Sequence, residues 1–272
     1  MELATTAIER PRDAYHWRLL ATALSFGLFG LGGLCLRLLV FPLLAFLPGD
    51  AARHRQRARR TIGWLFWRFI RFMHTAGVLT YEVEGAERLG RPGQMIIANH
   101  PSLIDVVFLI GLVRQANCVV KHSLFTNPFT RGPVSEAQYI GNDGSMDMLD
   151  NAVAALQQGQ PLIIFPEGTR TAPGQAPAFH RGAAAIALRG AKIITPVTIR
   201  VSPTTLTKHE PWYRIPCRRV HFSLRVGTDI DPQAYAAMGP APIASRRLND
   251  FLHQHYIKEL AADERCTATP AP

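Results

Sequence analysis

The sequence predicts an α/β domain with a mixed, largely parallel sheet flanked by helices, which follows a helical membrane anchor at the N-terminus. From about residue 79, short apolar strand patterns alternate with helical patterns, as in a sheet covered by helices. The stretch 219–226 alternates between polar and apolar residues, which is typical of a half-buried strand. Before this region, residues 19–36 form an apolar run without a charge, which indicates a membrane-associated helix.

Composition and pattern divide the chain into four segments. Residues 1–17 are a polar N-terminus, 18–77 hold the anchoring and amphipathic helices, 78–262 form the α/β domain, and 263–272 are a tail that we expect to be disordered. Strands are predicted over 79–84, 94–99, 117–121, 137–140, 161–165, 193–200 and 219–226. Helices are predicted over 103–113, 146–158, 181–189 and 244–262.

The apolar N-terminal region is interrupted. A run of 18 residues from Leu19 to Leu36 is at the short end for spanning a bilayer. Arg37 and Pro42 break its continuation toward residue 48. We therefore expect residues 18–48 to form two shorter helices, as a hairpin or a re-entrant pair, instead of one straight helix. An amphipathic helix is expected next, over residues 52–77, because apolar residues recur there at helical spacing.

The positive charge of the chain gathers beside this anchor. Residues 1–75 hold eleven arginines against four acids, which is +7 of the net charge of +10. The cluster 53–60 follows an apolar segment, so we interpret it as a flank that contacts anionic membrane lipids on the cytoplasmic face of a bacterial inner membrane. A signal peptide fits poorly, because no small-residue cleavage site precedes the cluster. A nucleic-acid partner is not expected, since the chain has no zinc-finger, helix-turn-helix or RNP-type pattern.

A histidine and an aspartate mark the end of the second predicted strand. His100 emerges after the apolar run 95–98, and Asp105 follows five residues later, where a helix is predicted to begin. A neutral imidazole can take a proton from a hydroxyl, and a carboxylate can hold its tautomer. The same aspartate completes an S-x-x-D capping box with Ser102 as the N-cap, so a purely structural role is an equal interpretation of Asp105 alone.

A second polar cluster follows the apolar strand 161–165. The residues Pro166, Glu167, Gly168, Thr169 and Arg170 offer a carboxylate, a flexible amide, a hydroxyl and a guanidinium. Arginine is suited to bidentate capture of a phosphate or carboxylate, and backbone amides around the glycine are candidates to support an oxyanion. A solvated Pro-Gly turn is the alternative if the loop is considered alone.

Together the two clusters resemble a known family. The pattern Asn99-His100-x-Ser102-x-x-Asp105 is similar to the first signature block of the lysophospholipid acyltransferases, which include the 1-acylglycerol-3-phosphate acyltransferases. The stretch 165–170 matches their third block at every residue, and 194–197 resembles the fourth. The resemblance covers about residues 79–230 and implies a glycerolipid acyltransferase-like fold and a membrane enzyme of phospholipid biosynthesis.

The resemblance implies a role for each matching residue. His100 would be the general base on the acceptor hydroxyl, and Asp105 would orient it. The remaining residues would bind substrate: Glu167, Gly168, Thr169 and Arg170 shape the acceptor site, Pro196 belongs to the acyl-donor side, and Lys121 and Arg131 are further candidates. The acyl group would come from coenzyme A or acyl carrier protein and pass directly to a lysolipid, without a metal, a bound cofactor or an acyl-enzyme.

One block departs from the family pattern and leaves the acceptor open. The second block usually ends in an arginine that helps to hold the acceptor phosphate, whereas this chain has Asn142 there, and Glu136 replaces the usual leading glycine. An acceptor other than a phosphoglycerol lipid is therefore an alternative. A thioester hydrolase is a weaker one, because the same pair would activate water but the chain has no G-x-S-x-G motif. A non-catalytic lipid-binding scaffold would not need the His-Asp pair.

Overall fold

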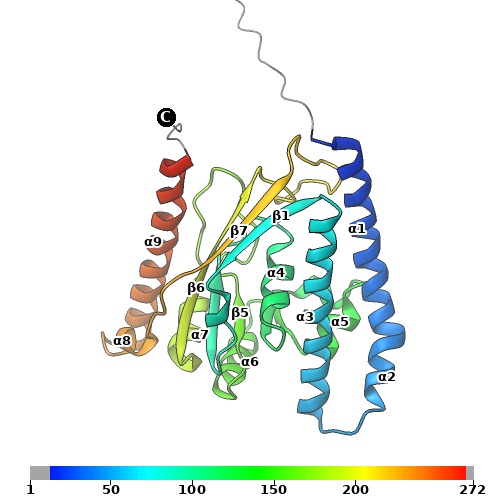
Figure 1. The fold of residues 1–272 in the computed structure, drawn as a ribbon. Helices are drawn as coiled ribbons and strands as arrows, with labels where there is room; N and C mark the ends of the chain where they lie inside the picture. Colours follow the sequence, from blue (N-terminus) through cyan, green and yellow to red (C-terminus); the bar gives the residue numbers. More distant parts are fainter. Residues whose placement is uncertain (1–12, 268–272) are drawn as a thin grey trace, which may run out of the picture.

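The computed structural model describes residues 13–267, with side chains described as far as residue 261 (Figure 1). The proposed loose N-terminus therefore lies mostly outside the described residues, as does the tail beyond residue 267. A seven-stranded sheet has the order β1-β7-β6-β2-β5-β3-β4, in which only β6 and β7 pair antiparallel. The strands are β1 (Leu79–Glu84), β2 (Gln94–Ala98), β3 (Asn117–Lys121), β4 (Ile140–Asn142), β5 (Leu162–Ile164), β6 (Ile193–Ser202) and β7 (Val220–Val226). The predicted mixed, largely parallel sheet is confirmed.

Helices cover both faces of this sheet. The helices are α1 (Tyr15–Cys35), α2 (Phe41–Ala45), α3 (Ala51–Thr75), α4 (Asp105–Leu112), α5 (Arg131–Glu136), α6 (Met146–Gln157), α7 (Gly182–Gly190), α8 (Pro232–Ala236) and α9 (Ala241–Thr267). Alternate residues of β2 face opposite sides, as strand geometry requires. Ile96 and Ala98 pack in a core with α3 and α4, and Met95 and Ile97 pack with α6, α7 and α9. In Figure 1, α9 accordingly lies across the sheet from α3.

The predicted boundaries of the strand at 137–140 and of the C-terminal tail were wrong. The strand predicted over 137–140 begins only at Ile140, because the turn that ends α5 continues through Gln138, whose φ of 49° is left-handed. The N–H of Tyr139 still donates to the Val134 carbonyl, so this residue belongs to the helix end. At the C-terminus, α9 continues to Thr267, and residues 263–267 are helical where a disordered tail was expected.

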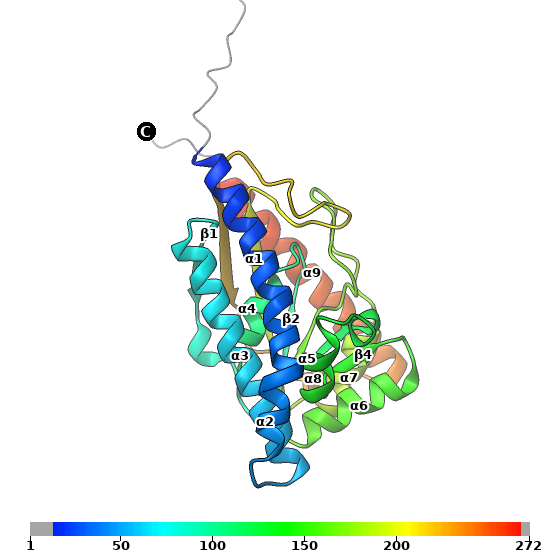
Figure 2. The same cartoon turned by 90° about the vertical axis from the view of Figure 1, so that its right-hand side faces the viewer.

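The apolar anchor is one helical run instead of the two helices predicted. Tyr15–Ala45 forms a continuous run of 31 residues, in which α1 and α2 follow one line (Figure 2). A π-helical turn, Leu36–Val40, separates them, and the N–H of Phe41 donates to the Leu36 carbonyl five residues earlier. This wider turn precedes Pro42, which has no N–H to donate, so the chain passes the proline without ending the helix. The hairpin forms after α2 instead, where Asp50 caps α3.

The anchor helix contacts the α/β domain at both of its ends. The buried Arg18 donates to the carbonyls of residues 216–218, and Arg37 donates to the Pro128 carbonyl. Between them, a Cβ placed on Gly33 would lie 2.1 Å from the Phe129 carbonyl oxygen, so the backbones touch there. The opposite face of the helix exposes leucines, among them Leu24, Leu28, Leu31, Leu38 and Leu43. The anchor is thus packed against the domain along one side and uncovered along the other.

Two glycines bring α3 and α4 into close contact. A Cβ on Gly63 would lie 2.7 Å from the Cα of Arg114, and a Cβ on Gly111 would lie 3.1 Å from the backbone nitrogen of Trp67. Larger residues would push the helices apart. Because α4 begins at Asp105, this crossing links the anchoring region to one of the two residues proposed for catalysis.

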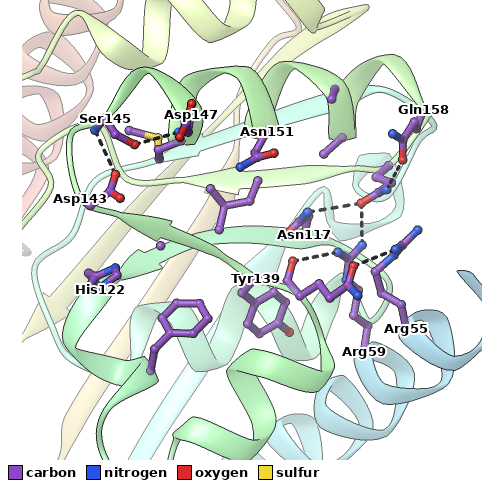
Figure 3. A pocket seen from close by; sticks show the side chains of 18 residues that line it. Arg55, Arg59, Asn117, His122, Tyr139, Asp143, Ser145, Asp147, Asn151 and Gln158 are labelled. Carbon is purple, nitrogen blue, oxygen red and sulfur yellow. Dashed lines mark hydrogen bonds between the residues drawn. The ribbon is translucent and has the colours of Figure 1, made fainter. Parts of the chain in front are cut away.

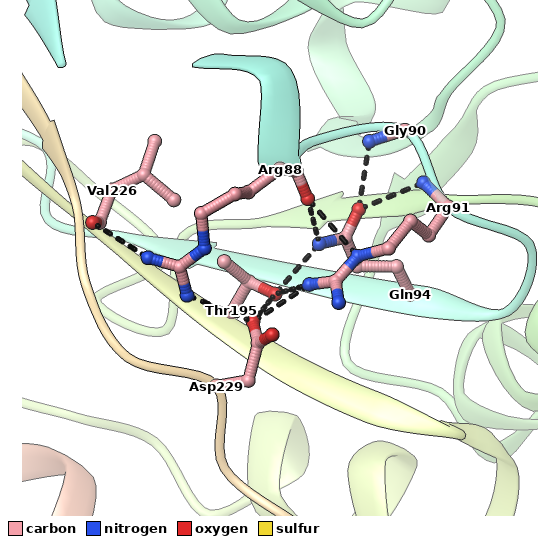
Figure 4. Close-up of polar contacts among 7 residues, drawn as sticks. All are labelled: Arg88, Gly90, Arg91, Gln94, Thr195, Val226 and Asp229. Atoms are coloured by element: carbon pink, nitrogen blue, oxygen red, sulfur yellow. Dashed lines mark hydrogen bonds and ion pairs between the residues drawn. The ribbon is translucent and has the colours of Figure 1, made fainter. Parts of the chain in front are cut away.

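A buried glutamine organises the other end of β2 (Figure 4). Gln94 is fully buried, and its side-chain oxygen accepts from the N–H groups of Gly90 and Arg91 at 2.7 and 3.0 Å. Its amide nitrogen donates to the Arg88 carbonyl and to the hydroxyl of Thr195, at 2.9 and 2.6 Å. Asp229 joins the network at 2.7 Å from both Arg91 and Thr195. This network fastens the loop before β2 to β6 and to the chain after β7.

We expect Gln94→Ala to lower the free energy of unfolding by about 2 to 4 kcal/mol, because it leaves buried backbone donors and a carbonyl without partners. Chemical denaturation of the purified protein in neutral detergent measures this. Gln175→Ala, in an exposed loop, is the matched control and should have little effect. A loss below about 0.5 kcal/mol for Gln94→Ala would contradict the role given to the network.

Candidate active site

Parallel strands deliver the candidate residues to one edge of the sheet. Because β2, β3, β4 and β5 run in the same direction, the segments after them emerge together. Asn99, directly after β2, is buried, and its side chain accepts from the Ile199 N–H at 2.7 Å and donates to the Ile199 carbonyl at 2.8 Å. The end of β2 is thereby held against β6, and His100 leaves the sheet from a fixed point.

His100 and Asp105 form the predicted pair. The Nδ1 atom of His100 lies 3.1 Å from Oδ2 of Asp105, which is completely buried. Oδ2 also accepts from the Ser102 N–H at 2.7 Å. Burial raises the pKa of Asp105, while the bonds from His100 and Ser102 oppose this rise. With a proton on Nδ1 shared with the carboxylate, Nε2 is left to accept a proton from a substrate hydroxyl.

The capping box predicted around Ser102 forms only in part. The helix begins at Asp105, not at residue 103, and Ile104 is its N-cap residue. The Asp105 side chain does bond back to the Ser102 N–H, but the Ser102 hydroxyl is buried without a partner among the described residues. Asp105 therefore bonds to the loop and to His100 through one and the same oxygen, and its Oδ1 has no partner in the described part of the chain.

Glu167 joins the two loops of the site. Its Oε1 accepts from the backbone N–H of His100 at 2.9 Å, and its Oε2 accepts from the Thr171 hydroxyl. The Thr171 N–H in turn donates to the His100 carbonyl at 3.1 Å. Glu167 is only 3% exposed, and this burial raises its pKa to about 7, against the lowering effect of the His100 N–H. The side chain holds the backbone of the proposed base.

The loop after β5 lines the site next to His100. The Phe165 ring lies 4.4 Å from the His100 ring, centroid to centroid, at an angle of 31°. Gly168 has a φ of 65°, which favours glycine. Its N–H donates to the Phe165 carbonyl at 3.1 Å, so the amide of Gly168 itself is engaged in the turn, and the prediction that amides around this glycine support an oxyanion stays a prediction. Thr169 is exposed beside it.

Arg170 connects the site to the loop after β6. Its NH1 group donates to the Leu206 and Thr207 carbonyls at 2.6 and 2.9 Å. The Leu103 N–H donates to the same Leu206 carbonyl at 3.3 Å, so this loop meets the start of the Asp105 helix. The charge of Arg170 also lowers the pKa of Asp105. One nitrogen of the guanidinium is thus committed to carbonyls.

Asn142 lies at the site, beside Gly168. A Cβ on Gly168 would be 3.7 Å from Nδ2 of Asn142 and 3.5 Å from Cδ2 of His180. Asn142 pairs in register with Lys121 at the ends of β4 and β3, and both are exposed. The position where the family usually has an arginine is therefore next to the proposed acceptor loop. His180 was not predicted from the sequence, because the long loop between β5 and α7 hides its proximity.

Two residues predicted to bind substrate, Pro196 and Arg131, take no part in these contacts among the residues that follow β2 and β5. Pro196 is buried inside β6, in register with Ile97, and its Cγ approaches the position a Cβ would take on Gly227. Arg131 is exposed at the start of α5. The adjacent Gly132 packs against Arg37 of the anchor. Neither makes a hydrogen bond with the residues at the end of β2 or β5 within the described chain.

The comparison with known proteins agrees with these motifs. Residues 80–200 match the acyltransferase family model. This segment is an acyltransferase-family domain. The resemblance drawn from the sequence is thereby confirmed, and the matched residues include the His100–Asp105 pair and the loop after β5.

Individual relatives carry the name of one activity. A 1-acyl-sn-glycerol-3-phosphate acyltransferase of Pseudomonas aeruginosa is 27% identical over 164 residues, which are 58% of this chain and 61% of the relative. A chloroplastic enzyme of the same name from Arabidopsis thaliana is 25% identical over 45% of this chain and 37% of its own length. The alignments thus span less than two thirds of these relatives. The crystal structure of the 1-acyl-sn-glycerophosphate acyltransferase PlsC from Thermotoga maritima has the same fold, with a TM-score of 0.68 and 18% identity over 95% of this chain and 98% of that one.

Because the pKa of Glu167 is raised, the stability of the folded protein should depend on pH, and Glu167→Gln should remove this dependence. Folding raises the pKa of Glu167 from 4.5 to about 7, so the folded protein holds this proton more tightly than the unfolded chain does. The contribution to the free energy of unfolding is fully present below pH 4.5 and is lost as the pH rises through 7. Glutamine stays neutral at every pH. The melting temperature of the variant, relative to the parent protein, should therefore increase from pH 5 to pH 8.

Thermal unfolding in neutral detergent at several pH values measures the difference in melting temperature between the variant and the parent protein. Other titrating groups are present in both proteins, so their effects on the melting temperature cancel in this difference. Glu87→Gln, at an exposed position, is the control and should show a constant difference. If Glu167→Gln also shows a constant difference, the buried carboxyl does not titrate in this range.

Proposed function

We propose that the protein is a membrane-associated O-acyltransferase that moves a fatty acyl group from acyl-CoA or acyl carrier protein to the hydroxyl of a lysophospholipid-like acceptor. The observation that carries this proposal is the contact between His100 Nδ1 and the buried Asp105, which leaves Nε2 uncommitted at the edge of the sheet. The match of residues 80–200 to the acyltransferase family supports the reaction class.

The reaction follows from this geometry in one direct transfer. Nε2 of His100 takes the proton of the acceptor hydroxyl while the hydroxyl oxygen attacks the thioester carbonyl. The C–S bond then breaks, and the imidazolium gives its proton to the departing sulfur, which leaves as a thiol. Asp105 favours the imidazolium that forms in between, because a carboxylate at Nδ1 stabilises the added charge. Glu167 keeps the His100 backbone in place throughout.

The anchor supports attachment along the membrane surface. Arg18 and Arg37 contact the domain about 28 Å apart along the helix, at 1.5 Å per residue. An upright spanning helix would carry these polar loops into the bilayer, where they have no partners. The exposed leucines instead enter the outer part of one leaflet, as in interfacial helices. The basic residues at the start of α3 favour the anionic cytoplasmic face of the membrane.

Asn142 supports a second candidate for the acceptor. Its neutral amide stands beside Gly168, so the site lacks the positive charge that the family pattern has at this position, and one nitrogen of Arg170 is engaged with two carbonyls. An acceptor whose head group lacks a phosphate at this point would fit such a site. Lys121, in register with Asn142, and the N–H groups of Arg170 that have no acceptor in the described chain are the cationic donors proposed for a phosphate-bearing acceptor.

His100→Ala should lower kcat/KM by at least about 100-fold, because the attacking hydroxyl loses its base. The assay follows transfer of a labelled acyl group from a thioester to lysolipid acceptors by the purified protein in detergent. His209→Ala, an exposed histidine outside the cluster, should keep full activity. Near-normal activity of a folded His100→Ala variant would refute the assignment, and thioester consumption that needs no acceptor would indicate a hydrolase.

Asn142→Arg should shift acceptor preference toward phosphate-bearing lysolipids. A charge-assisted bond to phosphate contributes about 1.5–3 kcal/mol, so the ratio of kcat/KM for lysophosphatidic acid over monoacylglycerol should rise about 10-fold or more. Asp143→Asn, the neighbouring position, raises the net charge by one without adding a guanidinium and is the control. An unchanged ratio for Asn142→Arg would show that this position does not contact the acceptor head group.

A further inference from the structure

A cavity of about 510 Å³ lies outside the proposed active site (Figure 3). It runs along the free edge of β4, between α3 and α6, and none of His100, Asp105, Glu167 and Arg170 lines it. Arginines of α3 form one end of it, and the turn between β4 and α6 forms the other. The arginine end of the cavity is therefore separate from the His100–Asp105 pair.

Arg59 places an uncompensated charge at the α3 end of this cavity. The residue is only 2% exposed, and its guanidinium donates to the Ala137 carbonyl and the Gln160 side chain, both at 2.8 Å, and to the Gln138 carbonyl at 3.4 Å. These acceptors are neutral. The ionisable groups that act on it are Tyr139, Arg55 and Cys118, none of them a carboxylic acid. Burial lowers the pKa of Arg59 to about 10, so it is still charged at neutral pH. Buried charges are ordinarily paired, and this one has no acidic partner among the described residues.

A second guanidinium stands one turn earlier on the same face of α3. Arg55 lines the cavity and donates to the Gln138 side chain at 2.8 Å, again to a neutral acceptor. Two like charges four residues apart on a helix repel each other, and an anion between them would remove this repulsion. The acids that line the cavity, Asp143 and Asp147, lie at its far end near Ser145. An anion is therefore drawn to the arginine end.

The hydroxyl of Tyr139 is a third donor without a partner. The residue lines the cavity and is 6% exposed, and its oxygen is buried with no hydrogen bond to any described group. Burial raises the pKa of Tyr139, so the phenol keeps its proton and can donate it to an anionic oxygen. A buried polar group usually has a partner, and an oxyanion near Arg59 would supply one.

We propose that Arg55, Arg59 and Tyr139 bind the phosphate group of a ligand in this cavity. Arginine side chains match phosphate oxygens in pairs of parallel bonds, and Arg59 and Arg55 retain N–H groups that donate to no described acceptor. The phosphate belongs to a soluble molecule or to the head group of an anionic phospholipid. Arg55 and Arg59 in its lining belong to the basic start of α3, and the chain just before α3 exposes the apolar residues Phe46 and Leu47.

The test measures thermal stabilisation of the full-length protein in neutral detergent. Sodium phosphate is titrated at constant ionic strength, with sodium chloride as the blank. In parallel, vesicles of phosphatidylglycerol are compared with vesicles of phosphatidylcholine. If the melting temperature rises saturably with sodium phosphate and not with sodium chloride, the ligand is a soluble phosphate compound. A rise only with phosphatidylglycerol identifies the lipid head group. Either result supports the site, provided that the variants behave as follows.

Arg55→Gln should weaken the stabilising ligand about 10-fold or more, and Tyr139→Phe about 5-fold. Both keep the fold, since Arg55 is half-buried and the Tyr139 hydroxyl has no partner to lose. Arg53→Gln removes the same charge from an exposed position of α3 and should bind like the parent protein. Equal weakening by Arg53→Gln and Arg55→Gln would show non-specific attraction and overturn the proposal. Absence of stabilisation by both phosphate and phosphatidylglycerol would also overturn it.

Discussion

The buried carboxylate of Glu167 is the constraint on which the rest of the site depends. It accepts from the backbone of His100 on one loop and from Thr171 on the other, and the Thr171 N–H closes the ring by donating to the His100 carbonyl. These hydrogen bonds thus fasten the loops after β2 and β5 to each other. Because β2 and β5 are parallel neighbours, both loops already emerge at the same edge. By bonding to both loops, the carboxylate fixes the position of the His100 imidazole at this edge.

The position of the site relative to the membrane follows from helix packing. The anchor packs on the α/β domain through Gly33, and α3 returns alongside it to cross α4 at Gly63 and Gly111. Because α4 begins at Asp105, backbone contacts lead from the apolar surface to the partner of His100 without a flexible linker. With the proposed membrane attachment, this packing would also set the orientation of the domain, so an acceptor in the bilayer would meet the sheet edge from a constant direction.

Sequence patterns predicted what depends on local spacing and missed what depends on distant contacts. The apolar strands before His100 and before Glu167 are short-range signals, and they predicted the sheet and the meeting of these two residues at one of its edges correctly. The start of α4 was misplaced because Ser102 fits a cap pattern, yet its hydroxyl makes no hydrogen bond with the residues that the structure describes. The break expected at Pro42 was wrong because a π-helical turn absorbs the missing donor. Arg59 looked like any other arginine of the basic cluster, since only the folded chain brings residues 137–160 around it.

The arginines of the first quarter of the chain therefore do different things, although the sequence presents them as one basic region. Arg18 and Arg59 are buried and are bonded to neutral oxygens, whereas Arg53 and Arg60 are exposed. Neutral oxygens satisfy the N–H groups of a guanidinium but leave its charge in place. A buried, uncompensated charge acts through a less polar medium than water and is screened less by salt, so it attracts an anion more strongly than a surface arginine does. In the site proposed above, the buried Arg59 would therefore supply the selective contact to the anion, while the exposed arginines would attract anionic lipid broadly.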